Sequence, residues 1–333
     1  MYYRLASNGA CQKDLSVRKP VTVVALGGNA ILQHDERGTF DQQYKNVKDT
    51  AARLADVIES GRHIVITHGN GPQIGATLIR HEMARKAVPP LPLDACGAET
   101  QGLLGYMIQQ SLEDELYRRS VKRPVVAIVT QVLVDKEDPA FRKPTKPIGP
   151  FYTREQAEEL HKSRKDLVIV EEKGKGFRRV VPSPDPKLIV EGEAIRTLVG
   201  DGVTITIACG GGGIPVVNDG LGFVGVEAVI DKDLAAERLA SVVAADRLVI
   251  LTDVNGVYLN YGKPDQKLID HPNIEELEEY IRQGQFAKGS MEPKVRAVIR
   301  FIRNGGKLAV IAHLRDIHLA LEGKAGTRVG SIE

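Results

Sequence analysis

The sequence has few of the features that mark several large classes of protein. Its three cysteines, Cys11, Cys96 and Cys209, form no Cys-x-x-Cys pair. Their number and spacing disfavour a disulfide scaffold or a zinc site and suit a reducing compartment. We therefore expect a cytoplasmic protein with no metal ion held by its own side chains.

The chain also lacks a charge excess and a long apolar run. The formal net charge of its 333 residues is only +2, which gives no sign of a nucleic-acid partner. No apolar stretch approaches the roughly 18 residues that a membrane helix needs. With 42% hydrophobic and 26% charged residues, the composition is that of an ordinary globular protein with a substantial core.

Residues 1–19 differ from the rest of the chain. They show no hydrophobic periodicity, and their basic residues outnumber their single acid. We interpret them as a disordered N-terminal extension, with an organelle-targeting segment as the alternative.

From residue 20 onward, short apolar runs rich in Val, Ile and Leu alternate with helical patterns. Strands are predicted within 21–28, 62–73, 123–134, 202–213, 246–259 and 305–314. Helices are predicted over 42–60, with Gly61 just beyond the end, and over 99–119. Continuously apolar strands separated by helices are typical of a mainly parallel sheet covered on both faces. The pattern predicts an α/β protein, a three-layer α/β/α sandwich with an open sheet.

Residues 135–186 interrupt this pattern with proline-rich, polar segments. The stretch nevertheless contains the aromatic residues Phe141, Phe151, Tyr152 and Phe177. Because aromatic side chains need burial or a ligand, we expect an ordered excursion, a lid or a small protruding subdomain, and not a linker.

Three predicted strands end in glycine-rich loops: Gly27-Gly28-Asn29, Gly69-Asn70-Gly71 and Gly210 to Gly213. Backbone amides at the carboxyl ends of parallel strands can surround an anion, and glycine allows close approach. The sequence has no P-loop, the glycine spacing does not match a dinucleotide fingerprint, and protein-kinase motifs are absent. A phosphate ligand would therefore need another cradle.

Two lysines occupy positions that favour phosphate chemistry. Lys232 lies between Asp231 and Asp233, directly after an apolar run that we predict to be a buried strand or loop. Lys294 falls in the first turn of a predicted helix, where the helix dipole disfavours a cation unless an anion faces it. A solvated surface lysine is the alternative for each. Asp233 could hold both lysines, and Asp231 could do the same or only cap the helix.

Taken together, the motifs VVALGGNAIL, THGNGPQIG, CGAETQGLLGY, PTKPIGPFY, VIDKDLA and FAKGSMEPKV resemble those of the carbamate kinases, within the amino acid kinase family. The resemblance extends from about residue 21 to the C-terminus. It implies a substrate-binding N-terminal lobe at about 20–200, a nucleotide-binding lobe at 201–333, and the subdomain at 135–186 inserted in the first lobe. It also implies a homodimer.

By the same resemblance, the enzyme transfers phosphate between ATP and carbamate with Mg²⁺, usually from carbamoyl phosphate and ADP towards ATP in arginine or related fermentations. The implied site residues are Lys232, Lys294 and Asp233 for catalysis, Gly27, Gly28 and Asn29 at the transferred phosphate, Gly69, Asn70 and Gly71 at carbamate, and Thr252, Asp253, Val254, Tyr258, Met291 and Lys294 at the nucleotide.

The subdomain is also expected to supply a lysine, Lys146, with Lys136 as the alternate. Glu292 departs from the family pattern, in which glycine is frequent at this position, and it could weaken phosphate affinity or point to solvent. His68, beside the second glycine loop, is interpreted as structural, since carbamate needs no general base. Other kinases of the family, acting on acetylglutamate, glutamate, aspartate or UMP, remain alternatives, as does a non-catalytic sensor.

Overall fold

The computed structural model describes residues 19–331 except 34, 166, 173 and 175. The expected N-terminal extension therefore lies, apart from Lys19, outside the described residues. No helix in the described part of the chain has the length and apolar character needed to cross a membrane.

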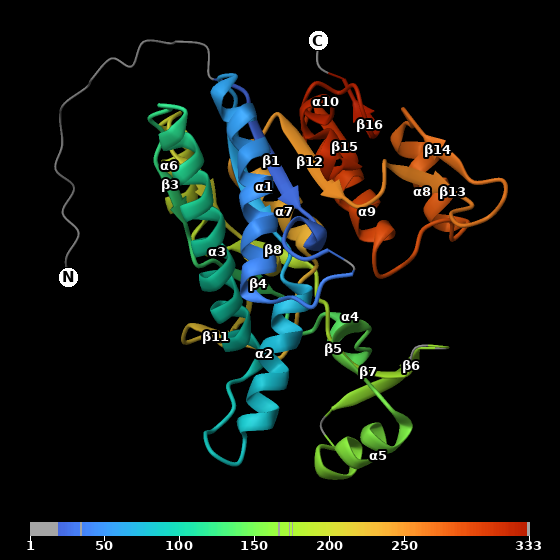
Figure 1. Ribbon diagram of the computed structural model, residues 1–333. Helices are drawn as coiled ribbons and strands as arrows, with labels where there is room; N and C mark the ends of the chain where they lie inside the picture. Colours follow the sequence, from blue (N-terminus) through green and yellow to red (C-terminus); the bar gives the residue numbers. More distant parts are fainter. Residues whose placement is uncertain (1–18, 34, 166, 173, 175, 332–333) are drawn as a thin grey trace.

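A seven-stranded sheet forms the middle layer of the molecule (Figure 1). In sheet order its strands are β16 (Thr327–Gly330), β15 (Leu308–His313), β12 (Arg247–Thr252), β1 (Val21–Leu26), β2 (His63–His68), β9 (Ile205–Ile207) and β3 (Val125–Ala127). All neighbours pair in parallel except β16, which is antiparallel to β15. β1 and β2 are buried along their whole length, which explains their continuous apolar sequences.

Helices cover both faces of this sheet. One face packs against α1 (Phe40–Glu59), α3 (Leu93–Arg118) and α10 (Ile317–Leu321), and the other against α6 (Gly192–Gly200), α7 (Lys232–Val242) and α9 (Met291–Arg303). Within β1, Val23 and Ala25 belong to one apolar cluster and Val24 and Leu26 to the other, as the two-residue period of a strand requires. The predicted three-layer sandwich is confirmed.

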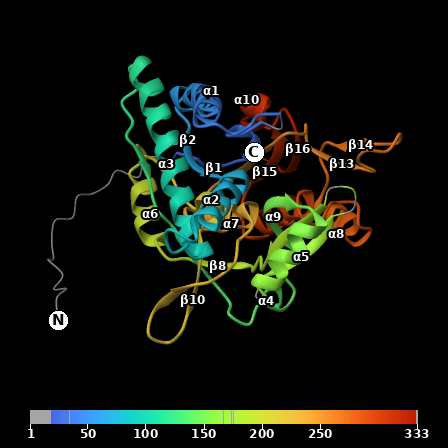
Figure 2. The ribbon, with the colours of Figure 1, turned by 60° about the horizontal axis from the view of Figure 1, so that its bottom comes forward.

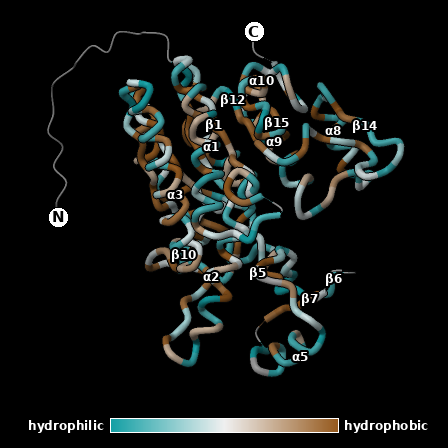
Figure 3. The backbone as a smooth tube through the Cα atoms, in the orientation of Figure 1, coloured by the Kyte–Doolittle hydropathy of each residue, from teal (hydrophilic) through white to brown (hydrophobic). Residues whose placement is uncertain are grey.

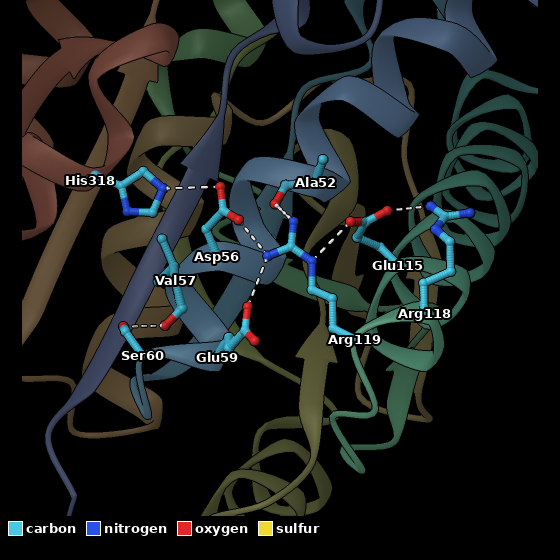
Figure 4. A network of polar contacts seen from close by, with 9 residues as sticks. All are labelled: Ala52, Asp56, Val57, Glu59, Ser60, Glu115, Arg118, Arg119 and His318. Carbon is cyan, nitrogen blue, oxygen red and sulfur yellow. Dashed lines mark hydrogen bonds and ion pairs between the residues drawn. The ribbon is translucent and has the colours of Figure 1, made fainter.

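Arg119, which follows α3, ties the helices of one face together (Figure 4). Its guanidinium donates to Glu115 of α3 at 2.9 Å, to the carbonyl of Ala52 at 3.2 Å, and to Asp56 and Glu59 of α1. His318 of α10 reaches the same Asp56 at 3.4 Å. The outer layer is thus joined by polar contacts as well as by its apolar face.

A smaller sheet of four strands lies beside the main one: β11 (Phe223–Gly225), β10 (Ile214–Asn218), β4 (Gln131–Val134) and β8 (Pro186–Ile189). The prediction of one strand within 123–134 is wrong in this respect, because β3 and β4 belong to different sheets. Between them the buried side chain of Gln101 accepts from the Thr130 amide at 2.8 Å and donates to the Thr130 carbonyl at 3.1 Å. The amide side chain thus replaces a strand partner where the chain changes sheets.

Residues 146–181 form a unit that projects from the sandwich (Figures 1 and 2). It contains the antiparallel strands β5 (Lys146–Tyr152), β7 (Gly176–Val181) and β6 (Val168–Glu172) and the helix α5 (Arg154–Ser163), and the short helix α4 (Pro139–Arg142) precedes it. Its aromatic rings lie against arginines, with Arg178 5.1 Å from the ring centre of Phe151 and Arg154 at the same distance from Phe177. Figure 3 shows apolar residues along the central strands and polar ones over much of α5.

The remaining helices and strands follow β2 or β12 in the chain or pack against α9. They are α2 (Gly71–Ala84), the hairpin β13 (Val257–Leu259) and β14 (Lys267–Ile269), and α8 (Ile274–Arg282). One sequence expectation needs correction here, and one open alternative is decided. The helix predicted over 99–119 begins at Leu93, and the apolar run 228–230 is a buried loop, whose Val229 amide donates to the carbonyl of Pro182 at 3.0 Å. Of the two forms left open for that run, the loop is correct.

Candidate active site

The three glycine-rich loops meet at the carboxyl ends of β1, β2 and β9. These strands lie close together in the sheet, so the loops that follow them are neighbours. The Gly69 amide donates to the carbonyl of Leu26 at 3.0 Å, and a Cβ added at Gly69 would lie 3.6 Å from the Gly28 amide and 3.1 Å from the Lys232 side chain. The first two loops therefore pack directly against one another and against Lys232.

Two of the glycines are required by close packing. A Cβ on Gly27 would come within 2.8 Å of the Leu251 carbonyl, and one on Gly211, whose φ is +66°, would come within 2.3 Å of the Asn70 amide. The side-chain amide of Asn70 donates to the Thr100 hydroxyl at 2.8 Å. The side chain of Asn70 is thus held, buried, between the third glycine loop and α3.

Asp231, Lys232 and Asp233 form the first turn of α7. The Asp231 carboxylate caps the helix by accepting from the Asp233 amide at 2.9 Å. One oxygen of Asp233 lies 2.5 Å from Nζ of Lys232, and the other lies 2.8 Å from Nζ of Lys294, which comes from the first turns of α9. A single carboxylate therefore holds two lysines that are 62 positions apart in the chain.

These three side chains are mostly withdrawn from solvent, with exposures of 3% for Asp233, 13% for Lys294 and 15% for Lys232. Burial alone would raise the pKa of Asp233, but the two ammonium groups outweigh it and hold the pKa well below its usual range. Burial also works against the charge of Lys294, yet Asp233 raises the pKa of that lysine above its ordinary value. Burial lowers the pKa of Lys232, against the opposing effect of Asp233.

A third lysine reaches this cluster from the projecting unit. Nζ of Lys146, at the start of β5, lies 2.7 Å from the Asp231 carboxylate. Lys136, the alternate, is exposed on the segment before α4. The structure thus brings Lys146, and not Lys136, to the cluster. Three lysines against two aspartates leave a formal charge of +1, which suits an anionic ligand.

A cavity of about 680 Å³ opens beside the lysines. Its volume falls within the range of small-molecule sites. The expected phosphate and nucleotide residues all line it: Gly27, Gly28, Asn29, Lys232, Thr252, Asp253, Val254, Tyr258, Met291 and Lys294. Gly69, Asn70 and Gly71 lie outside this cavity, behind Lys232 and at the start of α2.

One wall of this cavity was not predicted from the sequence. It is formed by the residues after β13 and by the loop from α8 to α9, namely Asn260, Tyr261, Lys263, Gln283, Gly284, Gln285, Phe286, Ala287 and Ser290. The Gln285 side chain accepts from the Asn260 amide at 3.1 Å and so joins the two segments. In the sequence, Gly284 was the signal for a turn after α8. The structure gives this glycine a φ of +68°.

The structure shows the contacts of Glu292 and His68, the two residues near the site whose roles the sequence left open. Glu292 lies 2.7 Å from Arg296, one helical turn along α9, whereas the ammonium of Lys294 pairs with Asp233. His68 is buried, and its Nδ1 lies 3.1 Å from the Gly69 carbonyl. Burial lowers the pKa of His68 to about 4, so its ring is neutral near pH 7. Both arrangements fit structural roles.

A family model, curated sequences and solved structures all relate this chain to the same group of proteins. Residues 20–313 match the model of the amino acid kinase family. The carbamate kinase of Pyrococcus horikoshii is 53% identical over 309 residues, covering 92% of this chain and 98% of that protein, and that of Thermococcus kodakarensis is 54% identical over 310 residues, with the same coverage. The structure of the Giardia lamblia carbamate kinase bound to AMP-PNP superimposes with a TM-score of 0.87 at 42% identity, covering 94% of this chain and 98% of the other. The chain therefore belongs to the amino acid kinase family, and within it to the carbamate kinases.

Proposed function

We propose that the protein is a carbamate kinase that transfers a phosphoryl group reversibly between ATP and carbamate. The observation that carries this proposal is the Asp233 carboxylate shared by Lys232 and Lys294 at the wall of the 680 Å³ cavity. High identity to the carbamate kinases supports this substrate over those of other family members. The two paired lysines argue against a sensor that has kept the fold and lost the chemistry.

The chemical problem is the approach of two anions. Two unit charges at ~4 Å repel by about 4 kcal/mol at an effective dielectric of about 20. In the direction of ATP synthesis, a terminal oxygen of ADP attacks the phosphorus of carbamoyl phosphate, and the bond from phosphorus to the carbamate oxygen breaks. Carbamate leaves as an anion and needs no proton, so neutralisation and positioning are sufficient.

Each part of the site has a role in this transfer. Lys232 and Lys294 face the phosphoryl oxygens, and Asp233 positions both ammonium groups. Amides of Gly27, Gly28 and Asn29 bind the transferred phosphoryl group, while the loop Gly69 to Gly71 lines the carbamate position. Lys146 approaches from the projecting unit, held by Asp231. The adenine nucleotide occupies the cavity beside Thr252 to Val254, Tyr258 and Met291.

Mg²⁺ fits this site as an ion held mainly by the nucleotide. Asp253 is the carboxylate among the described residues that line the cavity, whereas Asp233 is occupied by two lysines. A single carboxylate with phosphate oxygens and water is a common magnesium environment. When bound, Mg²⁺ supplies charge neutralisation at the phosphates.

The decisive experiment measures ATP formation from ADP and carbamoyl phosphate by the purified protein. Acetylglutamate, glutamate, aspartate and UMP, each with ATP, serve as controls in the kinase direction. We expect rapid ATP formation and no turnover of the controls. Turnover of a control without turnover of carbamoyl phosphate would replace the substrate assignment, and nucleotide binding without any turnover would support a sensor.

We also propose that the physiological direction is towards ATP, in arginine or a related fermentation, and that the protein is a homodimer. Exposed apolar side chains on α3 and on the hairpin β10–β11 offer the surface for a second copy: Leu103, Tyr106, Leu221, Phe223 and Val224. Light scattering of the wild type should give twice the mass of the chain, and Tyr106→Glu should shift the equilibrium to the monomer.

A further inference from the structure

A second group of chemically reactive side chains lies outside the proposed active site. Ligand atoms of His81, Cys96 and Glu99 all lie within 4.8 Å of one another. In the described part of the chain, no other trio of His, Cys, Asp or Glu residues converges this closely. The phosphoryl-transfer mechanism uses none of them.

The fold explains why these residues meet. Cys96 and Glu99 are three positions apart on α3, so they project from the same face of that helix. His81 lies in the last turn of α2, and the loop 85–92 returns the chain so that α2 packs against α3. The cysteine spacing gave no sign of such a site, because two of the three ligands are not cysteines.

The three donors are those of a transition-metal site. Thiolate, imidazole and carboxylate together favour zinc and its neighbours, and a thiolate disfavours magnesium or calcium. Three protein ligands leave one position of a tetrahedral ion for water. His81 also lines a separate cavity of about 620 Å³, between α2 and the projecting unit, from which that water could come.

Existing contacts among the donors are weak enough to be replaced. His81 Nε2 lies 3.3 Å from the Glu99 carboxylate, and the Cys96 thiol contacts the Leu91 carbonyl at 3.8 Å. Separations of up to 4.8 Å need to shorten to roughly 3.5 Å around one zinc ion, a change within the reach of side-chain rotation.

The electrostatic surroundings also favour a cation. The carboxylates of Glu99, Glu227 and Asp94 all lie close enough to the Cys96 thiol to act on it electrostatically. The same negative field attracts a divalent ion. Binding would replace the thiol proton, which passes to solvent as the metal–thiolate bond forms.

We propose that His81, Cys96 and Glu99 bind one divalent ion of the zinc class, which joins α2 to α3. The site lies on the α2–α3 pair, whose first helix also carries the loop Gly69 to Gly71 at its other end. Its three residues do not line the cavity of the proposed active site, and the ion would take no part in phosphoryl transfer.

The test uses the full chain after removal of metals with a chelator, titrated with Co²⁺ and followed by absorption. A 1:1 complex with a cobalt–thiolate charge-transfer band, displaced by Zn²⁺, is expected. Cys96→Ser should abolish the band, and His81→Gln and Glu99→Gln should each weaken Co²⁺ binding at least tenfold. Cys209→Ser removes the other described buried cysteine and should leave the spectrum unchanged.

Glu99 is about half exposed, so Glu99→Gln tests the site even where Cys96→Ser impairs folding. Absence of stoichiometric Co²⁺ binding, or a thiolate band that survives Cys96→Ser, would overturn the proposal. Because the readout is spectroscopic, its failure leaves the proposed carbamate kinase activity untouched, and the reverse also holds.

Discussion

The lysines of the proposed site come from two regions that hold them in different ways. Lys232 and Lys294 stand on helices of the sandwich and share one carboxylate that is 3% exposed. Lys146 stands on the projecting unit, is 25% exposed, and is held by Asp231. Packing of the sandwich fixes the positions of Lys232 and Lys294. The position of Lys146 depends instead on how the projecting unit packs against the sandwich.

The projecting unit, residues 146–181, buries few apolar side chains. Among the described residues of this unit, the buried apolar side chains are Ile148, Ala157, Leu167, Val180 and Val181. Ile148 and Val181 belong to an apolar cluster that also contains Ile74 and Leu93 of the sandwich. The unit is thus anchored at its base, and we expect perturbations there to affect binding more than global stability.

The largest expected effect is the loss of either buried lysine. Lys232→Ala or Lys294→Ala removes a cation that faces developing negative charge, and we expect kcat to fall by about 10²–10³-fold. The midpoint of urea unfolding should change little, because Asp233 keeps the other lysine as its partner. Unchanged kcat in both variants would contradict the assigned roles.

Asp233→Asn should be the most destabilising single change in the cluster. It leaves two buried ammonium groups without a counter-ion, which costs about 3–5 kcal/mol. Urea unfolding of the variant and the wild type measures the difference. A cost below about 1 kcal/mol would mean that water or another group already neutralises the lysines.

The acid side of the stability curve gives an independent measurement on the same residue. The folded-state pKa of Asp233 lies below its ordinary value of 3.8, so its contribution is present above that pH and is lost as the pH falls further. Wild type should therefore lose stability more steeply than Asp233→Asn below about pH 3.8. Parallel curves would contradict the depressed pKa.

A smaller effect is expected at the projecting unit. Lys146→Ala should lower kcat/KM by about tenfold, since this lysine is more exposed and its charge is better screened. Lys136→Ala is the matched control, because Lys136 is exposed and it is Lys146 that pairs with Asp231. An equal loss in both variants would remove the distinction between the two lysines.

The smallest effect is expected at Glu292. Its partner Arg296 is 52% exposed, and such pairs along a helix contribute about 0.3–0.5 kcal/mol. Glu292→Gln should leave the KM for ADP within about twofold and the unfolding midpoint nearly unchanged. A clear gain in ADP affinity would show instead that this carboxylate opposes phosphate binding.

Much of the site could be predicted because its residues belong to short local patterns. The glycines after β1 and β2 end buried strands, and Lys232 and Asp233 begin a helix, so their positions follow from local rules. The start of α3 could not be predicted in the same way. Its first amide, on Leu93, donates to the Glu227 side chain at 2.8 Å, and that cap lies 134 positions away.

The sequence by itself determined the alternation of strands and helices, the glycine loops and the candidate phosphate-binding lysines, because these depend on neighbours within one turn or one strand. Only the tertiary structure decided that Asp233 joins Lys232 to Lys294, that Lys146 and not Lys136 reaches Asp231, and that β3 and β4 enter different sheets. Those outcomes depend on which buried groups find partners across long separations in the chain. Packing of the whole molecule selects such pairings, and no local pattern of residues encodes them.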